Sequence, residues 1–127
     1  MSAPRRDEFA ALLGIDVVRR DAGHTVATLE TRAEHGNPHG TVHGAADRIE
    51  HGAVAAAAND EEHSGIISSV LVEYLQPAAI GDLLVAEVTR EASTTREDIF
   101  TGTVRRGAQG DLLAWVRARG TRRVRGR

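Results

Sequence analysis

The chain of 127 residues contains no cysteine and no lysine, because all sixteen of its basic residues are arginine. The absence of cysteine excludes a disulfide framework, a thiol nucleophile and a cysteine-ligated metal site. The absence of lysine excludes Schiff-base chemistry, which needs an amine side chain. Any catalysis must therefore use other side chains or backbone groups.

Aromatic side chains and long apolar runs are also scarce. The chain has two Phe, one Tyr and one Trp, so Phe100 and Trp115 are predicted to be core or interface residues rather than substrate stackers. No apolar run approaches the roughly 20 residues of a membrane helix, and residues 1–7 lack the apolar stretch of a signal peptide. The formal net charge of −2 argues against general nucleic-acid binding. We therefore expect a cytoplasmic protein without membrane or nucleic-acid partners, folded as a single domain over residues 1–127 with a basic tail from about residue 122.

The centre of the sequence is an alanine-rich segment. Residues 37–45 read Asn-Pro-His-Gly-Thr-Val-His-Gly-Ala and lead into a predicted helix from Gly44 to about Ala58. With 3.6 residues per turn, Ile49 fixes the helix phase and defines a small, apolar side facing the sheet. That side comprises Ala45, Ile49, Gly52, Ala53 and Ala56, and the opposite side comprises Asp47, His51 and Val54. The free N–H groups at the start of such a helix can polarise a carbonyl oxygen.

The remaining chain reads as one short helix and six strands. Residues 7–14 predict the short helix, and residues 15–20 and 25–31 predict a hairpin. After a polar connection at 59–65, four further strands are expected at 66–75, 83–92, 99–105 and 112–124, separated by turn residues. This order predicts an antiparallel α+β fold in which a sheet of five to six strands wraps a long central helix.

Two segments resemble the hotdog-fold acyl-CoA thioesterases, in the branch that includes the phenylacetate-pathway enzyme. Residues 37–44 look like the family's Asn-x-x-Gly-x-x-His-Gly-Gly motif. Residues 72–82 are similar to its strand ending, which is an aromatic residue, two residues, Pro-Ala, two residues and Gly-Asp or Gly-Glu. The resemblance covers about residues 9–122. It implies the hotdog fold, a homodimer with a continuous sheet, often paired into a homotetramer, and active sites at the dimer interface.

The resemblance also implies an Asp or Glu nine residues after His43, where this chain has Gly52. An ungapped alignment also places Glu50 on the sheet-facing side, where burying a carboxylate is costly. A gap of one residue near Ala45 instead brings His51 to the acidic position. We prefer the gapped alignment.

The family's second catalytic position, a Ser or Thr on the strand after the helix, is altered too. Counting two residues past Gly65 gives Ile67, and Ser68 falls on the opposite face of the strand. Ser68 remains a candidate substrate-binding residue. The resemblance adds three further candidates for substrate binding from the loop before the helix: Asn37, Gly40 and His43.

Five residues are candidates for catalysis. Gly44 and Ala45 would supply the N–H groups that hold the thioester oxygen. Asp47 and His51 are spaced i, i+4, so the carboxylate can orient the imidazole as a general base. Glu50 is the alternative acid. The structural alternative is a solvated helix face or a salt bridge between subunits.

Four of the six histidines, His35, His39, His43 and His51, lie close together in the sequence. Three of them fall in a Gly/Pro loop without cysteine, where the family motif accounts for their spacing. We therefore predict no metal site and no cofactor.

The last part of the chain is locally basic. These side chains are either solvated or contact the phosphates of coenzyme A or an acidic carrier protein. The arginines concerned are Arg117, Arg119, Arg122, Arg123, Arg125 and Arg127.

The sequence therefore predicts an enzyme that hydrolyses an acyl thioester carried by coenzyme A or by an acyl-carrier protein. One alternative is a biosynthetic lyase, dehydratase or cyclase on the same scaffold, using the changed acid–base residues on the substrate. A second alternative is a non-catalytic acyl-ligand-binding module, for which Asp47 and His51 would be dispensable.

Overall fold

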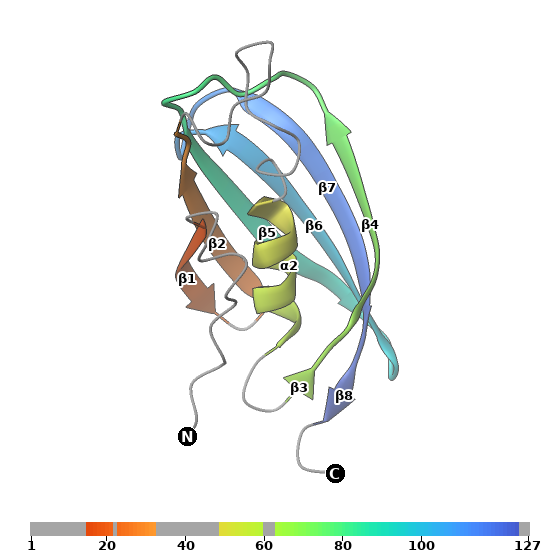
Figure 1. The fold of residues 1–127 in the computed structure, drawn as a ribbon. Coiled ribbons are helices and arrows are strands. Elements are labelled where there is room, and N and C mark those ends of the chain that lie inside the picture. The colour runs from red at the N-terminus through yellow and green to blue at the C-terminus, as the bar shows by residue number, and fades with distance from the viewer. Residues whose placement is uncertain (1–14, 22, 33–48, 60–62, 125–127) are drawn as a thin grey trace.

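The computed structural model describes residues 15–21, 23–32, 49–59 and 63–124. These residues form one helix and eight strands (Figure 1). In chain order they are β1 (Ile15–Asp21), β2 (His24–Glu30), α2 (Ile49–Ala58), β3 (His63–Ser64), β4 (Ile67–Tyr74), β5 (Leu83–Ser93), β6 (Glu97–Arg106), β7 (Leu112–Thr121) and β8 (Arg123–Val124).

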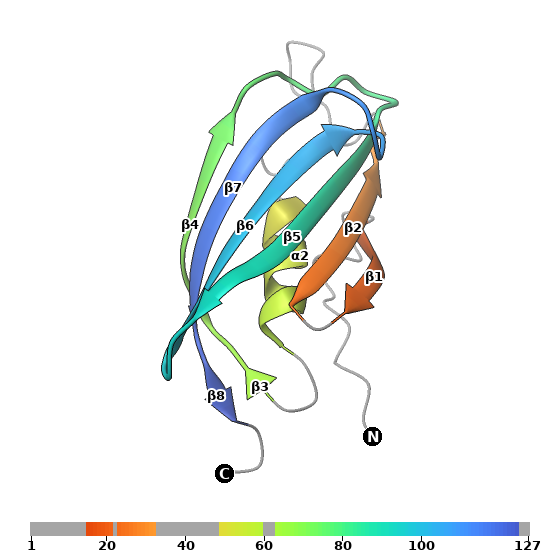
Figure 2. The same ribbon diagram turned by 180° about the vertical axis from the view of Figure 1, so that it is seen from behind.

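Six of the strands form one sheet in the order β1-β2-β5-β6-β7-β4, and every neighbouring pair is antiparallel. The sheet curves around α2, which covers one of its faces (Figures 1 and 2). Because β4 follows the helix and returns to the far side of β7, β1 and β4 are the two edges. The predicted α+β fold, with a sheet of five to six strands around a central helix, is confirmed.

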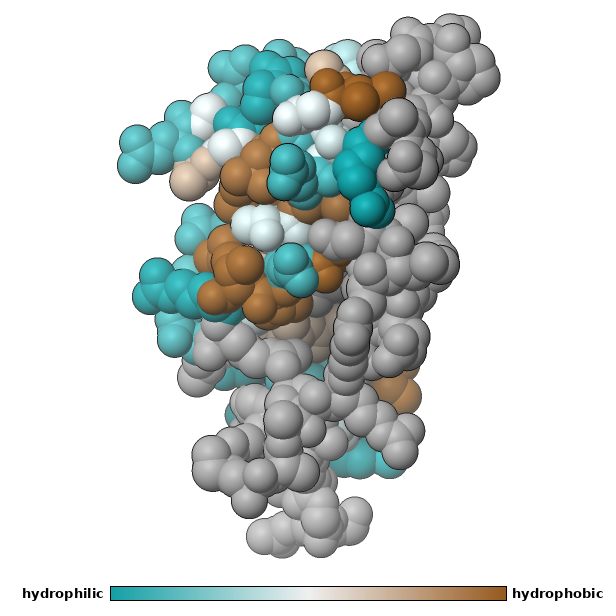
Figure 3. All heavy atoms as spheres, turned by 60° about the vertical axis from the view of Figure 1, so that its left-hand side comes forward, coloured by the Kyte–Doolittle hydropathy of each residue, from teal (hydrophilic) through white to brown (hydrophobic). Residues whose placement is uncertain are grey.

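The edge strand β1 carries a bulge and apolar residues on its surface. The register shifts between Val17 and Arg19, and Val17 and Val18 are exposed. Seen from the side of β1, apolar patches are interrupted by hydrophilic residues (Figure 3). A bulge and flanking charges on an edge strand disfavour pairing with another strand.

The core lies between α2 and the inner face of the sheet. Half of the ten helix residues are alanine, so the helix can approach the strands closely. Larger side chains, including Leu29, Leu84 and Phe100, fill the rest of the space and are fully buried. The core therefore combines small side chains from the helix with larger side chains from the strands.

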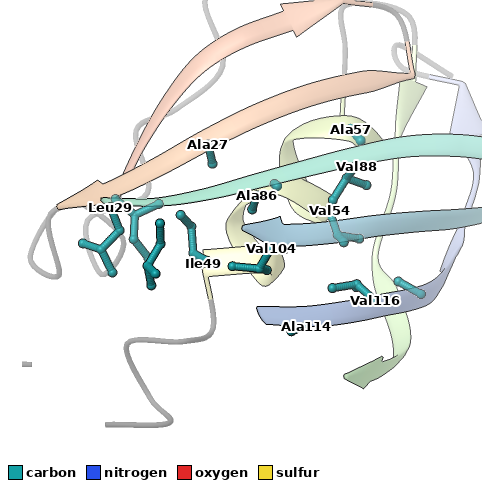
Figure 4. Packing of buried hydrophobic residues seen from close by; sticks show 14 of the residues in the cluster. Ala27, Leu29, Ile49, Val54, Ala57, Ala86, Val88, Val104, Ala114 and Val116 are labelled. Carbon is teal, nitrogen blue, oxygen red and sulfur yellow. The ribbon is translucent and has the colours of Figure 1, made fainter. Parts of the chain in front are cut away.

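The predicted helix phase is wrong at Val54. Ile49, Ala53 and Ala56 are buried as predicted, but Val54 is fully buried as well. Figure 4 shows Ile49 and Val54 among the buried side chains that β2, β5, β6 and β7 contribute. Helix α2 contacts all six strands of the curved sheet, so the flanks of the helix are covered in addition to its central stripe.

A second sheet, formed by β3 and β8, was not predicted. His63 pairs with Val124 and Ser64 pairs with Arg123. Residues 59–65 were predicted to be a polar connection, and residues 112–124 a single strand. The strand instead ends at Thr121. So short a pairing between segments far apart in the chain leaves no local pattern in the sequence.

The predicted short helix at 7–14 and the start of the central helix lie outside the described residues. The observed end of α2 at Ala58 agrees with the prediction. In the part of the chain that the structure describes, no helix has the length and apolarity needed to cross a membrane.

Candidate active site

The candidate residues fall into two groups. Glu50 and His51 lie in the first described turn of α2, and Ser68 lies on β4. The other six lie outside the described residues: Asn37, Gly40, His43, Gly44, Ala45 and Asp47. The roles assigned to these residues remain predictions.

The surroundings of α2 differ along the two helical rows that begin at Glu50 and His51. One turn after Glu50 comes Val54, which is fully buried, whereas one turn after His51 comes Ala55, which is partly exposed. Asn59 continues the second row, and its side-chain N–H donates to the carbonyl oxygen of Ala55 at 2.9 Å. The row of His51 therefore continues along the more open flank of the helix.

Thr25 on β2 fixes α2 against the sheet. Its hydroxyl donates to the carbonyl oxygen of Ala53 at 2.6 Å, and the side chains of both residues are fully buried. An alanine surface has few projections that could define its position on the strands, so this directional bond contributes to the register of the helix. Thr25 was not among the site residues predicted from the sequence, although a hydroxyl on the buried face of a predicted strand pointed to such a bond.

Ser68 is the extra residue of a bulge on the edge strand β4. The register with β7 shifts between Ile67 and Ser69, and the Ser68 hydroxyl donates to the carbonyl oxygen of Arg119 at 3.0 Å. Ile67, at the family's Ser or Thr position, packs against the core. The Ser68 hydroxyl is thus engaged in a hydrogen bond to the backbone of β7.

The loop that follows β4 explains the second sequence motif. Gly81 has a φ of 99°, a conformation that favours glycine. The Asp82 carboxylate accepts hydrogen bonds from the Ala79 N–H and the Arg106 Nε–H, both at 2.8 Å. The Thr31 hydroxyl donates to the Asp82 carbonyl oxygen at 2.8 Å. The motif therefore ties this loop to the end of β2 and to β6.

The same contacts shift two pKa values. The Ala79 N–H, followed by Arg106, lowers the pKa of Asp82 below its usual value. The hydrogen bond to Asp82 raises the pKa of Arg106. Both shifts favour the charged forms, so the ion pair stabilises the loop near neutral pH.

The edge strand β4 is a second feature relevant to an active site, because its free edge can pair with a strand of another subunit. Within the described residues, β7 lies on one side of β4 and no strand lies on the other. Val70 and Val72 pack against the core, whereas Leu71 and Tyr74 are exposed. An edge strand with exposed apolar side chains is suited to pairing with another strand.

No cluster of three His, Asp or Glu side chains within the described residues could hold a metal ion. The loop histidines His35, His39 and His43 lie outside these residues. The predicted absence of a metal site thus stays a prediction.

Comparison with known proteins points to one group, although no family model matches the chain. The acyl-coenzyme A thioesterase PaaI of Escherichia coli is 32% identical over 81 residues, which cover 63% of this chain and 58% of the relative. The match therefore spans less than two thirds of that protein. The structure of E. coli PaaI, from the phenylacetic acid degradation operon, has a TM-score of 0.86 and 25% identity, covering 92% of this chain and 85% of that one. The TT0310 protein of Thermus thermophilus has a TM-score of 0.84 and 27% identity, covering 92% and 98%.

The curved antiparallel sheet, the central helix and these similarities place the chain among the hotdog-fold proteins. Within that fold the chain is similar to the PaaI-type acyl-CoA thioesterases, the group that its two motifs resemble.

Proposed function

We propose that the chain hydrolyses an acyl-CoA thioester. The observation that carries this proposal is the similarity to E. coli PaaI, with 32% identity over 81 residues and a TM-score of 0.86 over 92% of the chain. The fold also supports the proposal, because the Thr25 hydroxyl bonds to the central helix across the core and β4 has no strand on its outer side within the described residues.

In the proposed mechanism the thioester carbonyl lies at the N-terminus of the central helix. The N–H groups of Gly44 and Ala45 donate to the carbonyl oxygen and stabilise the negative charge that develops there. His51, oriented by Asp47, takes a proton from the attacking water. The water oxygen bonds to the carbonyl carbon, the carbon–sulfur bond breaks, and the sulfur leaves as the thiol of coenzyme A with a proton returned from the imidazole.

Glu50 is the alternative base in this proposal. The open flank that follows His51 at Ala55, compared with the buried Val54 that follows Glu50, supports His51. A buried carboxylate would need compensating partners to stay charged, whereas an imidazole is a competent base in its neutral form.

A second copy of the chain completes the proposed site. Two β4 strands related by a two-fold axis pair in antiparallel fashion, which joins the two sheets and covers the apolar edge. The exposed Leu71 and Tyr74 support this arrangement. Light scattering at micromolar concentration should therefore show at least a dimer, and a monomer would contradict a shared site.

We also propose that the acyl group is carried by coenzyme A rather than by an acyl-carrier protein. Coenzyme A is preferred because the relative that matches in sequence is named as an acyl-coenzyme A thioesterase. Parallel assays with the same acyl group on coenzyme A and on an acyl-carrier protein would separate the two carriers.

One observation favours the lyase, dehydratase or cyclase alternative. Ile67 occupies the position where the family has a Ser or Thr, and the Ser68 hydroxyl bonds to the backbone of β7. A site without that hydroxyl has a changed acid–base set, which suits proton transfer on the substrate itself.

A thiol-release assay over short, medium and aromatic acyl-CoAs tests hydrolysis directly. We expect turnover with at least one class of acyl-CoA, and none with simple peptides or phosphoesters. A lack of thiol release across the whole panel, from protein shown to be folded, would contradict hydrolysis and favour the alternative reaction.

A further inference from the structure

The outer face of the sheet, opposite α2, holds an open hollow of about 600 Å³, a size that suits a small ligand. Figure 2 looks onto this face, with the helix behind the sheet. The hollow crosses β4, β7, β6 and β5, and it plays no part in the mechanism proposed above. Its lining includes Leu71, Glu73, Glu87, Thr103, Trp115 and Arg117.

The only tryptophan of the chain lies in this hollow. Trp115 of β7 keeps 58% of its surface accessible. Its direct neighbours in the sheet are Glu73 of β4 and Thr103 of β6. Residues that face each other across antiparallel strands have their Cβ atoms about 5 Å apart. An accessible indole therefore stands between a carboxylate and a short side chain.

Two charged side chains beside the indole are available to a ligand. Arg117 follows Trp115 by two residues on β7, so it emerges on the same face about 7 Å further along. Among the described residues, neither the Glu73 carboxylate nor the Arg117 guanidinium forms an ion pair or a side-chain hydrogen bond. By contrast, the Glu87 Oε2 atom on the far side of the hollow lies 2.9 Å from the His24 Nε2 atom.

The indole and Glu73 favour a cation. The face of a tryptophan attracts positive charge, and quaternary ammonium groups are bound in this way. A trimethylammonium group has no N–H, so it needs no hydrogen-bond acceptor from the sheet. Its methyl groups can pack against Trp115 and the exposed Leu71 while its charge faces Glu73.

Arg117 favours a carboxylate at the other end of the ligand. A guanidinium donates two parallel hydrogen bonds to such a group. A doubly charged phosphate fits poorly, because Glu73 and Glu87 also line the hollow and repel it. An extended chain of three carbons separates a quaternary nitrogen from a carboxylate by about 5 Å, within reach of both side chains.

We propose that the outer hollow binds a small zwitterion in which three carbons join a trimethylammonium group to a carboxylate. The cation lies over the indole of Trp115 beside Glu73, and the carboxylate accepts hydrogen bonds from Arg117. This proposal goes beyond the proposed hydrolysis and does not depend on it. The hollow lies on the face opposite α2, and pairing through the edge of β4 would leave this face open.

Titration with γ-butyrobetaine, followed by the fluorescence of Trp115, tests the proposal. The signal reports on the hollow directly, because the chain has no other tryptophan. We expect a saturable change at millimolar concentration. The isostere that carries a tert-butyl group in place of the trimethylammonium group keeps the shape and the carboxylate but lacks the positive charge. It should bind about tenfold more weakly.

Two charge-removing variants locate the ligand. Glu73→Gln and Arg117→Gln should each weaken binding of γ-butyrobetaine by about tenfold, since each removes one charged partner. The matched control is Arg119→Gln, which changes the next exposed arginine on the same face of β7, outside the lining of the hollow. It should leave the affinity unchanged. Circular dichroism shows that each variant is folded.

Three results would each overturn the proposal. They are a titration without saturation, equal binding of the tert-butyl isostere, and an affinity that Arg117→Gln leaves unchanged. A loss in Arg119→Gln as large as that in Arg117→Gln would also contradict it, because the effect would then reflect general surface charge. Thiol release from acyl-CoA, measured on the same samples without the zwitterion, reports on the proposed function separately.

Discussion

The two faces of the six-stranded sheet come from the same strands yet differ in burial and in polarity. On the inner face Ala86 and Val88 of β5 are fully buried against α2. On the outer face of the same strand, Glu87 and Thr89 are exposed. The inner face determines the fold and holds the helix to which we assign the chemistry, whereas the side chains of the outer face contribute little to the core. Substitutions on the two faces should therefore affect different properties.

The largest expected effect concerns the helix on the inner face. If His51 is the general base, His51→Ala should lower thiol release from acyl-CoA by about 10²–10⁴-fold, the usual contribution of general-base catalysis. Asp47→Asn should cost less, and the double variant should lose little more than His51→Ala alone, because coupled residues are not additive.

Glu50→Gln is the discriminating control for this prediction. We expect it to retain most of the activity of the wild type. Near-normal turnover of His51→Ala combined with loss of turnover in Glu50→Gln would mean that the alignment is off by one residue and that Glu50 is the base.

The next largest effect compares one aromatic residue on each face. Phe100 is fully buried and Trp115 is 58% exposed. Phe100→Ala should lower the free energy of unfolding by about 3–5 kcal/mol, because it leaves a cavity in the core. Trp115→Ala should cost less than about 1 kcal/mol when both variants are measured by urea unfolding. Equal losses would refute the contrast between the faces.

A smaller effect is expected from two threonines. Thr25 is buried and donates to the carbonyl oxygen of Ala53 in α2, whereas Thr89 is exposed on the outer face. Thr25→Val removes the bond while keeping the side-chain volume, and should cost about 1 kcal/mol of unfolding free energy. Thr89→Val should be close to neutral because valine is a good strand residue. If Thr25→Val is as harmless as Thr89→Val, the bond does not anchor the helix.

The smallest effect depends on pH. The pKa of Asp82 is lowered from about 3.8, first by the Ala79 N–H and then by Arg106. Its stabilising contribution is therefore complete above the ordinary value and is lost as pH falls through the lowered pKa. Asp82→Asn should cost about 1 kcal/mol at pH 7, since water screens an ion pair at the surface. The difference from wild type, followed by urea unfolding, should shrink below pH 4. A difference that is constant down to pH 2 would contradict this origin.

The strands could be predicted from the sequence because each has a local signal. The alternation around Ala27 and Leu29 and the turn near Gly23 define the first hairpin, and the structure confirms it at β1 and β2. Gly81 and Asp82 end the loop before β5 for reasons that the motif already contains. The pairing of β3 with β8 and the burial of Val54 could not be predicted, because both depend on how distant segments curve around the helix.

Less of the candidate site than of the fold could be predicted from the sequence. Two short motifs identified the fold and the class of relatives, which the comparisons confirm. The choice between Glu50 and His51 depends on which flank of the helix is open, and the helix period alone cannot reveal this. The role of Thr25 also required the packed structure, since its partner is a backbone carbonyl of a helix 28 residues away.

A crystal structure with a non-hydrolysable acyl-CoA analogue, in which a thioether replaces the thioester, would test the central claim most directly. We predict that the thioether lies at the N-terminus of the central helix, on the inner side of the sheet and beside the β4 edge of a second copy. His51 should then stand within about 3.5 Å of the position for the attacking water. An analogue bound only on the outer face of the sheet, or anywhere far from the start of the helix, would contradict the proposed site.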